Sequence, residues 1–250
     1  MEDISIFRLF PLKAMMRFAA HEASPMSVTD DFKIVRIEEH QSGLVLVATD
    51  GCRVGVWHES DGQAPKNPIG LPCDKETMKA LRVSKKVSQP DDHHFVTIET
   101  SKNILSTYKV GAHWKERIDK KETTWLEAAR EIFATEAPHA RVDFQPQDPF
   151  FTCSWQKWMP TTIVSSNATA PAVAIDLLST FAAILPRAGI IHLATQDDRH
   201  LIVFPTHPQF AGIVMPVAID NKTKRDVPET LRDVSTVIGK SCMLSADGPT

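Results

Sequence analysis

A hairpin of unusual composition, residues 44–57, constrains the fold of this chain more than any other segment. Four apolar residues run together from Leu44 to Val47, and the chain then enters an Asp50-Gly51 pair. A continuous apolar run of this length predicts a buried strand that enters a tight turn. Asp-Gly is a strong two-residue turn signal, because glycine adopts positive φ at little cost and aspartate tolerates it. The apolar residues that follow predict a returning antiparallel strand.

Two short segments resemble one protein family. Residues 48–54, Ala-Thr-Asp-Gly-Cys-Arg-Val, resemble the Ala-Thr-Asp-Gly-His-Arg-Leu signature of the bacterial DNA polymerase sliding clamp (β-clamp) family. Residues 210–217, Phe-Ala-Gly-Ile-Val-Met-Pro-Val, are similar to the Val-Met-Pro-Met segment in the last domain of that clamp. The resemblance implies an α+β fold with two DNA-clamp-like domains, each with antiparallel sheets on the outside and helices on the inner face.

In this family the two segments meet in a hydrophobic pocket that captures short peptides of polymerases and other clients. The resemblance therefore implies a peptide-binding site with two walls. One wall is expected to contain Thr49, Gly51, Cys52, Arg53 and Val54, and the other Val214, Met215, Pro216 and Val217. A groove of Met, Val and Pro with an arginine at its rim can hold an extended peptide with apolar anchors. The alternative for each segment taken alone is a core strand followed by an ordinary turn.

The chain is expected to contain two domains and a tail. A clamp-like domain resembling the middle domain of the bacterial clamp is predicted over residues 1–120, and one resembling its last domain over 121–217. A turn-rich loop at residues 61–68 divides the first domain into two similar halves. Residues 218–250 form a C-terminal tail of unassigned role. Helices are predicted at residues 12–22, 75–83, 124–133 and 174–185, with a polar link at 111–121 and a capping box at Thr124–Glu127.

Basic residues follow stripes on two of the predicted helices. A helix capped by Asp74 places Lys75, Lys79, Arg82 and Lys86 along one face, and an earlier helix places Lys13 and Arg17 along another. Such stripes often mark only a solvated helix face. Clamp domains carry helices that line a central hole, so the resemblance implies sequence-independent contact with the phosphates of double-stranded DNA. The predicted helix at 174–185 carries almost no positive charge, which predicts weaker contact in the second domain.

Composition is that of an ordinary globular protein. The chain has 250 residues, of which 42% are hydrophobic and 24% charged, and its net charge is −3. No apolar run approaches the roughly 18 residues that cross a bilayer, and the first residues lack a basic secretory region, so a cytoplasmic location is expected. The four cysteines are widely spaced and are expected to be free thiols.

An enzymatic interpretation rests on one segment, Asp91-Asp92-His93-His94. Its residue types suit a divalent metal ion, but Pro90 before it favours a solvated loop. Neighbouring residues of a strand point to opposite faces, so the four cannot share one ion on a strand. Trp155 and Trp158 are expected to pack in a core or between domains. No nucleotide-binding glycine loop or hydrolase motif occurs, so no catalytic residue, metal site or cofactor is predicted.

The leading hypothesis is a noncatalytic ring protein that encircles DNA and tethers a polymerase and a clamp loader through their peptides. The family's chain has three domains and closes a six-domain ring as a dimer, so a two-domain chain favours a homotrimer. The first alternative is a clamp-like interaction protein that binds clamp partners without encircling DNA. A metal-dependent hydrolase is the second. Cys52 replaces the histidine of the signature, which puts the polar part of the pocket in doubt.

Overall fold

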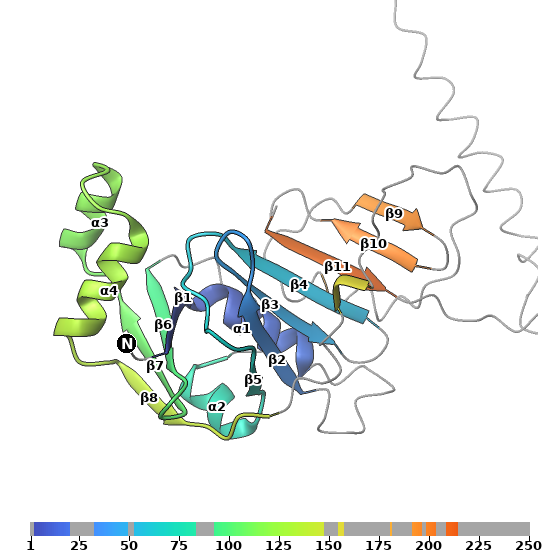
Figure 1. The fold of residues 1–250 in the computed structure, drawn as a ribbon, viewed down its shortest axis with the longest axis horizontal. Helices are drawn as coiled ribbons and strands as arrows, with labels where there is room; N and C mark the ends of the chain where they lie inside the picture. The colour runs from blue at the N-terminus through green and yellow to red at the C-terminus, as the bar shows by residue number, and fades with distance from the viewer. Residues whose placement is uncertain are drawn as a thin grey trace, which may run out of the picture. The chain divides into compact units, whose positions relative to one another are not determined.

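The computed structural model describes residues 3–20, 33–49, 53–83, 93–147, 155–157, 181, 192–196, 199–203 and 209–214 (Figure 1). Its first part contains one unit twice, namely a strand, a helix and three further strands. The first copy consists of β1 (Ile4–Arg8), α1 (Leu9–Ala19), β2 (Ile34–Glu39), β3 (Leu44–Thr49) and β4 (Arg53–Glu59). The second consists of β5 (Ile69–Pro72), α2 (Lys75–Ala80), β6 (His94–Glu99), β7 (Ile104–Lys109) and β8 (Ala140–Asp143).

The two copies exchange their first strands. β1 pairs with β6 of the second copy, and β5 pairs with β2 of the first copy. The result is a four-stranded sheet with the order β1-β6-β7-β8 and a sheet that begins β5-β2-β3-β4. Every named pairing is antiparallel, which confirms the predicted α+β class with antiparallel sheets.

The second sheet continues into the C-terminal part of the chain. β11 (Phe210–Val214) pairs with β4, and β10 (Arg199–Val203) and β9 (His192–Gln196) follow, so this sheet has seven strands (Figure 1). β4 therefore lies between β3 and β11. Its counterpart β8 pairs with β7 alone among the described strands.

Helix α1 forms the centre of the main hydrophobic core. All of its residues except Lys13 are buried, and it packs against strands of both sheets. Pro11 lies in the first turn, where a proline is tolerated because its missing N–H has no helical partner. The apolar residues that face α1 recur at every second position of the strands, for example Leu44, Leu46 and Ala48 of β3.

Helices α3 (Ala112–Asp119) and α4 (Trp125–Thr135) connect β7 to β8. They cover the face of the four-stranded sheet that points away from α1, where Phe95, Tyr108 and Trp125 form a second apolar cluster. Thr124 and Glu127 close the predicted capping box, and these hydrogen bonds lower the pKa of Glu127. The prediction of a polar link at 111–121 is wrong, because this segment is helix α3.

Trp155 lies in a short 3-10 helix (Trp155–Lys157) and covers the outer face of the seven-stranded sheet. It packs against valines of β3 and β4 and against Ile213, and its indole N–H donates to the Glu38 carboxylate. The expected packing role of this residue is confirmed. Of the predicted helix at 174–185 the structure describes only Phe181, which is helical. Trp158 and the tail 218–250 lie outside the described residues.

Candidate peptide-binding and nucleic-acid surfaces

The two segments that carry the sequence resemblance lie side by side. β4 and β11 pair so that Arg53 is opposite Val214 and Val54 is opposite Ile213. Thr49, at the end of β3, is opposite Val54 on the other side of β4, and its hydroxyl donates to the Arg53 carbonyl at 2.8 Å. Four of the nine predicted pocket residues are thus within one patch of sheet. The other five, Gly51, Cys52, Met215, Pro216 and Val217, lie outside the described residues.

Alternation along the strands distributes these side chains over both faces of the sheet. Arg53 and Val214 point toward α1, where the Arg53 guanidinium lies 4.8 Å from the Phe18 ring centroid. Val54 packs on the opposite face in the cluster of Trp155 and Ile213. Arg53 is 1% exposed and Val54 is 2% exposed. The prediction of an arginine at the rim of the groove is therefore not met, because α1 and its aromatic side chains cover Arg53.

A pair of glycines allows close packing at this junction. Gly55 of β4 is directly opposite Gly212 of β11. A Cβ on Gly212 would lie 2.1 Å from the Phe181 ring, and one on Gly55 would lie 3.3 Å from Phe210. Phe181 lies 5.3 Å from Phe18 between ring centroids, in an edge-to-face arrangement. The aromatic rings thus lie directly on the backbone where β4 and β11 meet.

The basic residues predicted on α2 are exposed but do not form one helical stripe. Lys75 and Lys79 lie one turn apart on a helix that ends at Ala80. The helix begins as predicted, since the Asp74 carboxylate accepts the Thr77 N–H at 2.7 Å. Arg82 follows the helix with φ of 52°. Its predicted place in the stripe is wrong, and Lys86 lies outside the described residues.

Arg82 occupies the left-handed position of a Schellman motif. The Val83 N–H donates to the Met78 carbonyl at 2.8 Å and the Arg82 N–H to the Lys79 carbonyl at 3.0 Å. This position favours glycine, and a residue with a Cβ is strained there. The helix ends three residues before the predicted end at Val83, and the sequence has no glycine there to mark the motif.

The two basic residues of α1 differ in exposure. Lys13 is partly exposed and is the only residue of α1 that is not buried. Arg17 is 8% exposed, and burial lowers the pKa of its guanidinium. The surface that the structure describes therefore presents Lys13 but not Arg17.

A cavity of about 350 Å³ lies between α1, the end of α2 and the four-stranded sheet. Lys13 and Arg82 line it together with Lys109 and His94. His139, just before β8, completes a set of five basic side chains. Sequence reasoning missed the last three. In the structure the pairing of β6 (His94–Glu99) with β7 (Ile104–Lys109) brings two of them together, since its register places His94 opposite Lys109.

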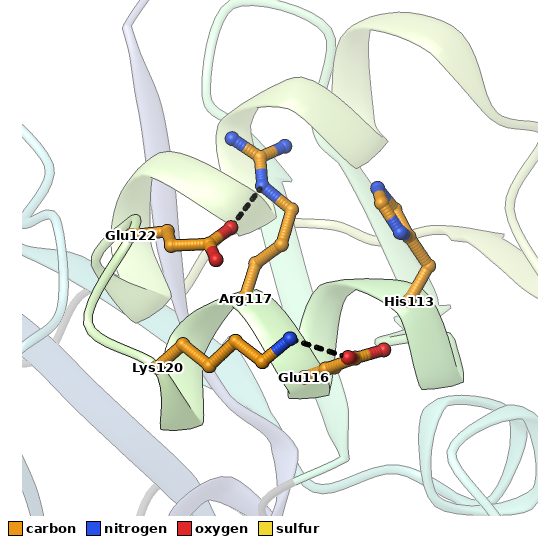
Figure 2. Close-up of a pocket in the computed structure, with 5 residues that line it drawn as sticks. All are labelled: His113, Glu116, Arg117, Lys120 and Glu122. Atoms are coloured by element: carbon orange, nitrogen blue, oxygen red, sulfur yellow. Dashed lines mark hydrogen bonds and ion pairs between the residues drawn. The ribbon is translucent and has the colours of Figure 1, made fainter.

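By contrast, positive and negative side chains are balanced on and just after α3. A cavity of about 430 Å³ is lined by His113, Glu116, Arg117, Lys120 and Glu122. Figure 2 shows how these five side chains lie. Lys120 contacts Glu116 at 2.7 Å and Arg117 contacts Glu122 at 3.8 Å, so most of the charge is paired (Figure 2). Such exposed pairs contribute little to stability. This surface has no excess of either sign.

Of the segment proposed for metal binding, His93 and His94 are described and Asp91 and Asp92 are not. Within the described ranges no three His, Cys, Asp or Glu residues gather as metal ligands would. The same ranges contain no helix that is both long and apolar enough to span a membrane. Cys73 is a free thiol whose pKa is raised, first by burial and then by the Asp74 carboxylate.

Comparison with protein-family models and with curated proteins finds no match. Comparison with solved structures finds a putative DNA polymerase III beta subunit from Eubacterium rectale ATCC 33656, with a TM-score of 0.53 and 9% sequence identity over 94% of this chain and 68% of the other. The DNA polymerase III beta subunit from Thermotoga maritima has a TM-score of 0.52 and 10% identity over 90% and 68%. The DNA polymerase sliding clamp from Bacillus subtilis has a TM-score of 0.52 and 8% identity over 92% and 68%.

These likenesses confirm at the level of the fold what the two short segments imply. The repeated strand-helix-strand unit, the exchanged first strands and the junction of β4 with β11 occur in a chain that superposes on clamp structures over nearly its whole length. The chain therefore has the fold of the bacterial DNA polymerase sliding clamp.

Proposed function

We propose that this protein is a noncatalytic sliding clamp that encircles double-stranded DNA and tethers a polymerase through a peptide-binding pocket. Its clamp fold supports the proposal, but the observation that carries it is the pairing of β4 with β11. That pairing joins two segments which lie far apart in the sequence and resemble the two walls of the clamp pocket. A tether of this kind raises polymerase processivity through effective concentration rather than through chemistry.

The peptide pocket is proposed at the end of the β4–β11 pair. Arg53 and Val214 are opposite one another, and Cys52 and Met215 are their direct chain neighbours. The described part of the pocket is its buried base, and Gly51, Cys52, Met215, Pro216 and Val217 are proposed as its open walls.

Contact with DNA is proposed for the exposed basic residues on the side of the helices. Lys75, Lys79 and Arg82 are exposed, and Lys13 is partly exposed. Lysine and arginine contacts to phosphates do not depend on base sequence, which suits a protein that must slide. We leave Arg17 out of this set because it is buried. Lys86 remains in it on the sequence pattern alone.

A ring needs an interface, and the fold offers one at β8. Its counterpart β4 pairs on both edges, whereas β8 has one partner among the described strands. An open edge presents backbone N–H and C=O groups that a further strand can pair with. We propose that a second copy of the chain pairs there, and that three copies of two domains each close the ring. The division into two domains belongs to this proposal, with the first boundary placed after β8 and not near residue 120, because β8 pairs with β7. The second boundary stays near residue 217.

Light scattering on the purified protein separates this proposal from the alternative of a clamp-like protein that does not form a ring. The proposal predicts a mass about three times that of the 27.8 kDa chain at micromolar concentration. A stable monomer under those conditions would favour the nonring protein. The Phe144 N–H donates to the Asn103 carbonyl, so by alternation the Arg141 N–H of β8 points away from β7. A variant with Arg141 replaced by proline removes a backbone donor from the proposed edge and should shift the mass toward the monomer. Ser101→Pro, in the exposed turn between β6 and β7, serves as the control. Gln63 is unsuitable for this purpose, since it pairs with Ile6.

A further inference from the structure

We propose that the cavity between α1, the end of α2 and the four-stranded sheet is a phosphate-binding site. Its lining contains three permanent cations, Lys13, Arg82 and Lys109, and two histidines. Among the lining residues that the structure describes there is no aspartate or glutamate. A concave site lined by one sign of charge concentrates ions of the opposite sign. The strands contribute basic residues that no helix stripe predicts.

The position of Lys109 shows why an anion suits this site. Lys109 ends β7 and is directly opposite His94, which begins β6. Residues directly opposite in an antiparallel pair place their side chains on the same face. The neighbouring pair Phe95 and Tyr108 faces α4, so Lys109 and His94 face the side of α1. Both side chains line the cavity, where a phosphate can accept a hydrogen bond from the Lys109 ammonium and from a ring N–H of His94.

The backbone at Arg82 is a second and independent sign of function. Arg82 holds φ of 52° in a position that glycine occupies without strain. A strained residue of this kind is kept where its side chain is needed. The Schellman hydrogen bonds fix the Arg82 backbone at the mouth of the cavity, and its exposed guanidinium can offer a phosphate two parallel donors.

The floor of the cavity is rigid. Thr107 is buried in β7, between its partners Val96 and Ala140. Its carbonyl accepts the His139 N–H at 2.8 Å, which fixes His139 at the rim. The basic side chains therefore come from a helix, a helix end, two strands and the residue before a third strand, all held by one core, which is the preorganisation that an anion site needs.

The ligand chemistry is a phosphate group, and two sources can supply it, a phosphodiester of duplex DNA or a free polyphosphate. Binding of a DNA phosphodiester rests on the proposed function, whereas binding of a free polyphosphate does not. Titration calorimetry with pyrophosphate and anisotropy with a short labelled duplex, on the same full-length proteins, distinguish them. Lys109→Gln removes one charge from the cavity, and Lys120→Gln removes one from the exposed face of α3 as a matched control.

With DNA as the source, Lys109→Gln reduces the slope of log affinity against log salt by about 0.9 and weakens binding about eightfold at 0.1 M salt. Pyrophosphate competes, and Lys120→Gln behaves as the wild type. Arg82→Gly separates binding from folding, since relief of strain raises the thermal midpoint while phosphate affinity falls. Equal pyrophosphate and DNA binding by wild type, Lys109→Gln and Arg82→Gly overturns the site but leaves the clamp proposal standing. If the wild type binds pyrophosphate but no duplex, and Lys109→Gln loses pyrophosphate, the site stands and the clamp proposal falls.

Discussion

The contact between β4 and β11 can be measured in solution by a double-mutant cycle on Val54 and Ile213. The two side chains are directly opposite, 2% and 1% exposed, and share the cluster of Trp155. Val54→Ala removes two methyl groups, at about 0.8 kcal/mol each plus a cavity term, so a loss of about 2 kcal/mol is expected. Ile213→Ala is expected to cost about 3 kcal/mol.

Because the two residues touch, their effects should not add. Cross-strand neighbours and residues that share a cavity show interaction energies of about 0.5–1 kcal/mol. The double variant is therefore expected to lose about 4 kcal/mol rather than the sum of the single losses. Urea unfolding followed by tryptophan fluorescence gives the free energies, and unchanged m-values show that the transition is comparable among variants.

Ile98 provides the control for this cycle. It is buried in the four-stranded sheet and belongs to a different apolar cluster from Val54. Val54→Ala and Ile98→Ala should add to within about 0.3–0.5 kcal/mol. If Val54 and Ile213 are additive to within about 0.3 kcal/mol as well, the two segments do not pair, and the basis of the proposed pocket is lost.

Three further predictions concern single residues. Arg82→Gly should raise the free energy of unfolding by about 0.5–1 kcal/mol, because relief of the left-handed backbone exceeds the added entropy of the unfolded chain, and calorimetry should show a midpoint about 1–4 °C higher; an unchanged or lower midpoint would argue against strain. The pKa of the Cys73 thiol is raised in the folded protein, so its contribution to the free energy of unfolding is fully present at neutral pH. Above about pH 8.5 the free energy of unfolding of the wild type should fall by about 1.4 kcal/mol per pH unit relative to Cys73→Ala. Parallel stability profiles of the two proteins would refute this. Replacing Met215 and Val217 with Glu should abolish binding of a client peptide without changing the mass of the assembly, and retention of peptide affinity would place the pocket elsewhere.

Much of the first half of the fold follows from local signals. The apolar run of β3 and the Asp50-Gly51 turn predict the β3–β4 hairpin, and the Asp74 and Thr124 caps predict where α2 and α4 begin. Helix ends were less predictable. α2 ends at Ala80, and the left-handed residue that follows its C-cap is Arg82, at a position that glycine usually marks.

Other features depend on contacts that sequence patterns do not encode. Helix α3 has no fully buried residue and is held by the packing of Trp114 and Ile118 against the second apolar cluster, so its polar sequence resembles a link. Alternation places Arg53 with Gly55 and Trp57 on one face, but both faces of the strand are apolar, so the face that meets α1 could not be chosen. The burial of Arg53 and Arg17 is decided by what packs over them.

The central claim, that the protein encircles DNA, is tested most directly by comparing circular and linear DNA of the same sequence. The protein is assembled on a nicked circular plasmid and exposed to high salt, and the bound fraction is measured before and after the plasmid is cut once. A topological link survives salt that screens phosphate contacts, so we expect protein to stay on the circle and to be lost on linearisation. Equal retention on circular and linear DNA at every salt concentration, or complete loss from both at high salt, would contradict the claim.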